Sequence, residues 1–166
     1  MTSGLEDYIK IVLSNNIKEL VNLSVWCLTN YVSENVAIAS ELEAKDFLDL
    51  VIQSLEKNPE DEEIKASCIW FLSTFLVYQK HYNLELSKKA FAPIILELTR
   101  YPELVSPDSN SLDDIIRAVK NYVDSKEEYK ERIAHLLNYE FLFPLLKSCL
   151  LVKSKSLNTD ALMILG

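Results

Sequence analysis

The sequence NLSVWCLTNYV, residues 22–32, recurs in altered form along the chain, and its recurrence is the strongest indication of the fold. Shifted by 44 residues it falls on ASCIWFLSTFL, by 91 on DDIIRAVKNYV, and by 137 on TDALMILG. Its apolar residues lie three, four or seven positions apart, which places them on one side of an α-helix. Copies of one helix at spacings of 44, 47 and 46 residues predict a helical repeat protein.

Aligned positions of the copies, here called columns, keep the same type of side chain. This is expected if every copy buries the same face of its helix. Two columns are apolar throughout, one is aromatic, and an apolar column lies beside the aromatic one. In that order the columns are Val25, Ile69, Ile116 and Leu162; Leu28, Leu72, Val119 and Leu165; Tyr31, Phe75 and Tyr122; and Val32, Leu76 and Val123.

The composition supports long helices. Only two glycines occur in 166 residues, and 49% of the residues are hydrophobic. Sandwiches, barrels and Rossmann-type folds need tight turns and glycine-rich loops, so this composition disfavours them. We therefore expect an all-α protein with one domain spanning 1–166. Its repeat units are expected at about 1–34, 35–79, 80–125 and 126–166.

The intervals between copies predict two further helices in each unit. In the first interval a short helix is expected at 36–42 and a longer one at 44–58, before PEDEE opens the next copy with acidic residues. Pro93 and Pro144 are expected near the start of the second helix of their intervals, where the missing N–H costs little. Each unit of about 45 residues then holds three helices and cannot bury its apolar face alone, so the units should stack into a solenoid.

The last copy stops inside its third helix with the apolar sequence ALMILG. A terminal repeat normally carries a polar outer face. We therefore expect the chain to be the N-terminal fragment of a longer solenoid, or a partner or second copy of the chain to cover this end.

This arrangement resembles the armadillo and HEAT-like repeats, in which the third helix of each unit lines a concave surface. WCLTN, from Trp26 to Asn30, matches the Trp-x-x-x-Asn pattern of peptide-binding armadillo proteins. The resemblance implies a right-handed α-solenoid of about three and a half repeats, with Asn30 on the backbone of an extended peptide and Trp26 against its side chains. The units are somewhat long, and Thr74 and Arg117 interrupt the Asn and Trp ladders, which indicates a divergent member without an importin-type array.

The third helices also place a polar and aromatic stripe beside the core columns. Asn22, Trp26 and Asn30 follow one another at intervals of four and so share a helix face. Trp and Arg often dominate binding energy, and amides can pair with a peptide backbone. Alternatively, the tryptophans fill gaps between repeats. The predicted anchors are Trp26, Asn30, Trp70 and Asn121, with Asn22, Arg117 and Thr74 as flanking contacts.

We therefore expect a non-enzymatic interaction scaffold or adaptor that binds a protein or peptide along this face. A weaker resemblance, in DALMILG, to Smg-GDS-type armadillo proteins implies the alternative of a small-GTPase-binding regulator, an exchange factor or chaperone. The net charge of −8 favours a basic partner and disfavours nucleic acid, whose binding rests on clustered Lys and Arg.

Catalytic and metal motifs are not apparent. The pairs His81–Glu85 and His135–Glu131 supply too few ligands for a metal, and no glycine-rich phosphate loop occurs. We expect no enzyme, cofactor or metal. The longest uncharged run has 14 residues, too short to span a membrane.

The cysteines and the N-terminal sequence indicate the cellular compartment of the protein. The three cysteines include no CxxC pair, and the N-terminus lacks the apolar segment of a signal peptide. Buried reduced thiols are expected, in an intracellular protein of the cytoplasm, the nucleus or both.

Overall fold

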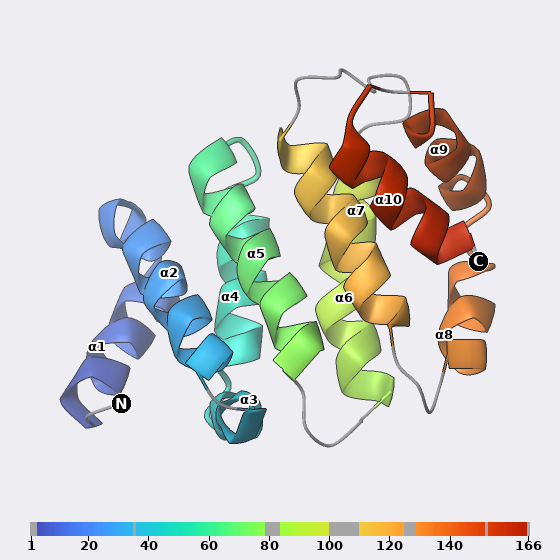
Figure 1. Cartoon of the computed structure of the whole chain (residues 1–166). Coiled ribbons are helices and arrows are strands. Elements are labelled where there is room, and N and C mark those ends of the chain that lie inside the picture. The colour runs from blue at the N-terminus through green and yellow to red at the C-terminus, as the bar shows by residue number, and fades with distance from the viewer. Residues whose placement is uncertain are drawn as a thin grey trace. The chain divides into compact units, whose positions relative to one another are not determined.

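Figure 1 shows the computed structural model of the chain, which describes residues 3–34, 36–78, 84–99, 110–124, 129–151 and 153–165. The described residues form helices joined by turns, without a strand among them, so the expected all-α class is confirmed. The chain divides into two compact units, residues 1–90 and 91–166, with the boundary inside one helix. Each unit is described by itself.

The first unit is built from two layers of helices. It contains α1 (Ser3–Ser14), α2 (Lys18–Glu34), α3 (Val36–Ala44), α4 (Phe47–Lys57), α5 (Glu62–Tyr78) and the start of α6 (Leu84–Thr99). Helix α2 packs beside α5, and α1 packs beside α4 in the layer behind them (Figure 1). The short helix α3 packs against α2, α4 and α5. The unit therefore places two copies of the repeated helix side by side.

Polar contacts fix the register between these two copies. Lys18 Nζ lies 3.1 Å from Asp61 Oδ2, at the starts of α2 and α5. The turns that precede these helices are joined by a reciprocal amide pair, in which Asn58 donates to Asn16 over 2.8 Å and Asn16 donates back over 3.3 Å. Because the partners lie about one repeat apart in the sequence, α2 and α5 run parallel with equivalent positions next to each other.

The core of this unit contains the columns that the repeat predicts. Every member of the apolar columns in α2 and α5 is buried, and so is the aromatic Phe75. The buried members are Val25, Leu28 and Val32 from α2 and Ile69, Leu72, Phe75 and Leu76 from α5. Tyr31 is half-buried instead, and burial together with Glu41 and Glu6 raises the pKa of its hydroxyl. The buried face of both helices is thus confirmed.

The second unit contains the end of α6 with α7 (Asn110–Val123), α8 (Tyr129–Leu136), α9 (Leu142–Cys149) and α10 (Lys155–Leu165). Helix α10 packs against α7 and α9, and α8 packs against α7. An aromatic cluster fills the core, where the ring of Phe91 stacks on that of Tyr122 at 4.0 Å. The Tyr122 hydroxyl lies 2.8 Å from His135 Nδ1, which joins α8 to α7.

The fourth copy of the repeated helix departs from its predicted alignment. Ile116, Val119 and Tyr122 of α7 are buried as expected, but Leu162 of α10 is 58% exposed and Leu165 is half-buried. Helix α10 instead buries Leu157, Ala161 and Ile164. These residues follow the buried positions of α2 at a shift of 136 rather than 137. A slip of one residue turns a helix by about 100°, so the predicted alignment of this copy is wrong by one position.

The helices between copies follow the prediction in the first and third intervals. Helices α3 and α4 occupy the first, and α8 and α9 the third, with Pro144 in the first turn of α9. The second interval differs, since its described residues 84–99 form the single helix α6 with Pro93 inside it. A proline inside a helix removes one backbone hydrogen bond, and here the helix continues across it.

A candidate protein-docking face on α2 and α5

Helices α2 and α5 turn equivalent positions toward solvent. We define the docking face as the outward positions of the two helices, which repeat at intervals of three or four residues. Because the helices run parallel in register, four of the five members on each helix are equivalent at a shift of 44 residues, and Leu23 and Ala66 are not. It comprises Glu19, Leu23, Trp26, Asn30 and Ser33 from α2 and Glu63, Ala66, Trp70, Thr74 and Val77 from α5.

Both tryptophans of the chain lie on this face. The exposed fraction is 50% for Trp26 and 44% for Trp70, so neither side chain fills the interior between the helices. Leu23 and Val77 are exposed to a similar extent on the same face. Exposed large apolar side chains that gather in one place on a protein are characteristic of interaction surfaces.

Asn30 and Thr74 occupy equivalent positions one turn after the tryptophans. Asn30 donates from Nδ2 to the Trp26 carbonyl oxygen over 3.0 Å, and the Thr74 hydroxyl donates to the Trp70 carbonyl oxygen over 2.8 Å. Both residues are half-buried. An amide has a second donor hydrogen and an acceptor oxygen, so Asn30 can hold its own helix and still bond a peptide group.

Asn22 has a structural contact across the two helices. Its Oδ1 accepts a hydrogen bond from the hydroxyl of Ser67, so the amide joins α2 to α5 about one turn before the tryptophans. Asn22 was expected as a flanking contact for a partner, and the structure places it between the helices, half-buried.

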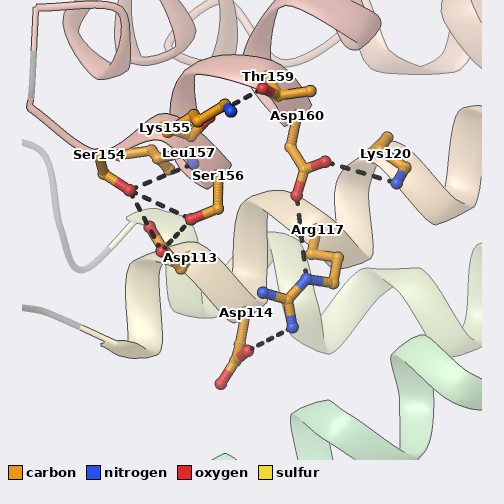
Figure 2. A network of polar contacts seen from close by, with 10 residues as sticks. All are labelled: Asp113, Asp114, Arg117, Lys120, Ser154, Lys155, Ser156, Leu157, Thr159 and Asp160. Carbon is orange, nitrogen blue, oxygen red and sulfur yellow. Dashed lines mark hydrogen bonds and ion pairs between the residues drawn. The ribbon is translucent and has the colours of Figure 1, made fainter.

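Arg117 and Asn121 lie on α7 in the second unit, and Asn121 is half-buried. Arg117 pairs with Asp114 at 3.1 Å and lies 3.9 Å from Asp160 of α10, which also meets Lys120 at 3.4 Å (Figure 2). The guanidinium of Arg117 therefore contributes to the packing of α10 on α7. Asp114 is partly buried, and burial raises the pKa of its carboxyl although Arg117 opposes the shift.

Acidic side chains mark one end of the docking face. Glu19 in the first turn of α2 and Glu62 and Glu63 in the first turn of α5 are exposed. Asp61 caps α5, since its Oδ1 accepts from the backbone N–H of Ile64 over 3.2 Å. This hydrogen bond and the Lys18 ammonium hold the pKa of Asp61 below its usual value. The face thus combines an acidic end with an apolar and amide-bearing middle.

Metal-ligating geometry is not found among the described residues, where no three His, Cys, Asp or Glu side chains are grouped to hold an ion. His135 instead lies between two tyrosine hydroxyls, at 2.8 Å from Tyr122 and 3.4 Å from Tyr139. His81 lies outside the described residues. Cys68 and Cys149 are buried free thiols, and Cys27 is half-buried.

Two apolar members of the docking face, Leu23 and Val77, are not among the residues predicted from the sequence. Leu23 precedes Trp26 by three residues and Val77 follows Trp70 by seven, so both share the tryptophan side of their helix. That spacing was visible in the sequence. Nothing in a single helix pattern, however, says whether the apolar side chain beside a core stripe is covered or exposed.

Comparison with known proteins gave no match: no protein-family model, curated protein or solved structure matches the chain. Within the described part of the chain, none of the helices has the length and apolar character needed to cross a membrane.

Proposed function

We propose that the chain is a non-enzymatic interaction scaffold, and that an extended basic peptide segment of a partner protein binds across the docking face. The observation that carries the proposal is the pair of half-exposed tryptophans at equivalent positions of two parallel neighbouring helices. Covering a solvent-exposed indole with a partner removes apolar surface from water and so favours binding. Trp is among the residues that most often dominate binding energy.

The chemistry of the face supports a basic peptide in particular. The indole rings of Trp26 and Trp70 can attract the cationic side chains of Lys or Arg through cation–π interactions. Glu19 and Glu63 add negative charge to the same face, and the whole chain carries −8. Asn30 supplies an amide for the peptide backbone, whose N–H and C=O groups need partners once water is displaced.

The wider architecture belongs to the same proposal. We infer an armadillo-like α-solenoid whose repeated third helices form the docking face, and an intracellular protein in which reduced thiols persist. The parallel, in-register packing of α2 on α5 supports this interpretation, because stacked repeats bring equivalent helices next to each other.

Tryptophan fluorescence gives a direct test because both tryptophans lie on the docking face. Lys- and Arg-rich peptides of about twelve residues, matched by Glu-rich peptides of the same length, would be titrated into the protein. Basic peptides should shift and change the emission with saturation, and acidic peptides should not. Saturable binding of the acidic peptides alone, or of neither set, contradicts the proposal.

Substitution separates binding from folding. Trp26→Ala with Trp70→Ala should weaken binding of a labelled basic peptide by tenfold or more, on the order of the effect of one hot-spot residue, while far-UV circular dichroism stays unchanged. Tyr8→Ala is the matched control, since Tyr8 of α1 is 51% exposed and lies outside the face. Purified Ras- and Rho-type GTPases in both nucleotide states test the alternative of a GTPase regulator, which nucleotide-dependent binding would favour.

A further inference from the structure

The first turn of α10 is fastened to α7 by two hydroxyl groups that share one carboxylate. Ser156 donates from Oγ to Asp113 Oδ2 over 2.8 Å, and Ser154 donates to the same oxygen over 3.4 Å (Figure 2). Ser154 also caps α10, because its Oγ accepts from the backbone N–H of Leu157 over 3.3 Å. The contact depends on hydroxyl protons that point at the Asp113 carboxylate. A negative charge on either serine would therefore turn this attraction into repulsion.

The segment that carries these serines is locally basic within an acidic chain. Lys153 and Lys155 precede Ser156 by three positions and by one, and all three residues are exposed. Neither lysine forms an ion pair with any residue that the structure describes. An exposed serine after two exposed lysines has the charge that complements an acidic peptide-binding cleft.

We propose that Ser156 is a phosphorylation site for a protein kinase that selects basic residues before the serine, and that phosphorylation releases the start of α10 from α7. The kinase and a nucleoside triphosphate are the co-reactants. The Ser156 oxygen bonds to the terminal phosphorus, the bond from that phosphorus to the bridging oxygen breaks, and the nucleoside diphosphate leaves. The hydroxyl proton goes to the catalytic carboxylate of the kinase.

Electrostatics explain the release. A phosphoserine carries about −1.5 to −2 charges at neutral pH and has lost the hydroxyl hydrogen, so it repels Asp113 where Ser156 now donates to it. The helix itself is not expected to melt, because negative charge is favourable in the first turn of a helix. One turn further on, Asp160 still meets Lys120 at 3.4 Å. The change is therefore confined to the start of α10.

Ser154 is the poorer substrate. It is half-buried, and its oxygen both donates to Asp113 and caps α10. A kinase would have to break both contacts to reach it. Ser156 also makes two contacts, with Asp113 and with the Ser154 hydroxyl at 3.2 Å, but it is exposed and does not cap the helix.

The first experiment asks where the phosphate goes. The full chain is incubated with ATP and a purified serine/threonine kinase that prefers basic residues, and the product is mapped by fragmentation mass spectrometry. One phosphate is expected on Ser156, and its rate of addition should fall several-fold in a Lys153→Ala/Lys155→Ala variant. Phosphate only at other serines, or none after prolonged reaction, overturns the assignment.

The second experiment asks whether charge at this position releases the helix. Hydrogen exchange of the Leu157 amide, which is bonded to the Ser154 cap at the start of α10, is compared between Ser156→Glu and the neutral control Ser156→Gln, each with and without Asp113→Asn. Ser156→Glu should exchange about tenfold faster than Ser156→Gln, as expected for loss of a hydrogen bond to a charged group, and Asp113→Asn should remove the difference. Equal rates in the two single variants overturn the release.

Should Ser156→Glu fail to fold, the double variant with Asp113→Asn decides the question. A folded double variant supports repulsion between positions 113 and 156, and an unfolded one overturns it.

Discussion

Burial governs the reactivity of individual residues in this chain, and the cysteines show it most directly. Burial raises the pKa of the Cys68 thiol to about 12 and, with a contribution from Asp113, that of Cys149 to about 11. Cys27 lies on α2 and is half-buried. The thiolate is the reactive form of cysteine, so two of the three thiols should be inert in the folded protein.

Thiol titration checks this expectation. At pH 8 in the absence of denaturant, a disulfide reagent such as DTNB should modify Cys27 first, while Cys68 and Cys149 react at the rate at which their surroundings open. Adding urea above the unfolding midpoint should make all three react within the mixing time. A Cys27→Ser variant serves as the control and should show no fast phase. Fast modification of all three thiols in the folded protein would contradict the burial described above.

Helix α2 has one buried side and one exposed side. Leu28 is fully buried among the repeat columns, whereas Leu23 on the same helix is 57% exposed. The side of a helix that a residue occupies thus decides its contribution to stability, because a cavity forms only where neighbours surround the removed atoms.

The same substitution at these two positions tests the register of α2. Leu28→Ala should lower the free energy of unfolding by about 2 to 5 kcal/mol. Leu23→Ala should change it by about 0.5 kcal/mol or less. Urea titration followed by circular dichroism measures both. Similar losses for the two variants would show that α2 is rotated relative to this structure.

Asp61 couples the start of α5 to pH. Its pKa is lowered in the folded state from an ordinary value of 3.8. The hydrogen bond from the Ile64 N–H is the largest cause, and the Lys18 ammonium is the next. A group with a depressed folded pKa adds stability above its unfolded pKa and loses it as pH falls through the folded value.

Asp61→Asn removes the charge but keeps a capping side chain, so it isolates the ionic part of this contribution. The urea midpoint of wild type should exceed that of Asp61→Asn above roughly pH 5, and the difference should shrink below roughly pH 4. Asp61→Ala, which also lacks the cap, should be the least stable variant throughout. A difference between wild type and Asp61→Asn that stays constant from pH 7 to pH 3 would contradict the ionic account.

The net charge of −8 on the chain should speed its association with a basic peptide. Raising ionic strength from about 0.1 M to about 1 M shortens the Debye length from about 10 Å to about 3 Å. Stopped-flow tryptophan fluorescence should then show the association rate constant falling by about tenfold. The dissociation rate constant should change much less. An association rate constant independent of salt would leave apolar contact alone as the basis of binding.

The sequence predicted helix class and buried faces well because a period near 3.6 and a repeat of about 45 residues are strong patterns. It placed the core columns of α2, α5 and α7 correctly, apart from Tyr31 of α2, which is half-buried. It failed by one residue in α10, since Leu162, Met163, Ile164 and Leu165 are consecutive apolar residues and leave the buried side ambiguous. Asn22 and Arg117 were predicted as partner contacts, and each has a cross-helix contact that depends on tertiary packing, which a helix pattern does not contain.

The cross-helix hydrogen bonds also bear on how the chain folds. The partners lie 42 and 45 residues apart in the first unit and 41 and 43 apart between α7 and α10. The entropy lost on closing a loop grows only with the logarithm of its length, so these closures cost similar amounts. Contacts between distant parts of a sequence slow folding. The two compact units should therefore form their cross-helix contacts at similar rates, and neither requires the ends of the chain to meet.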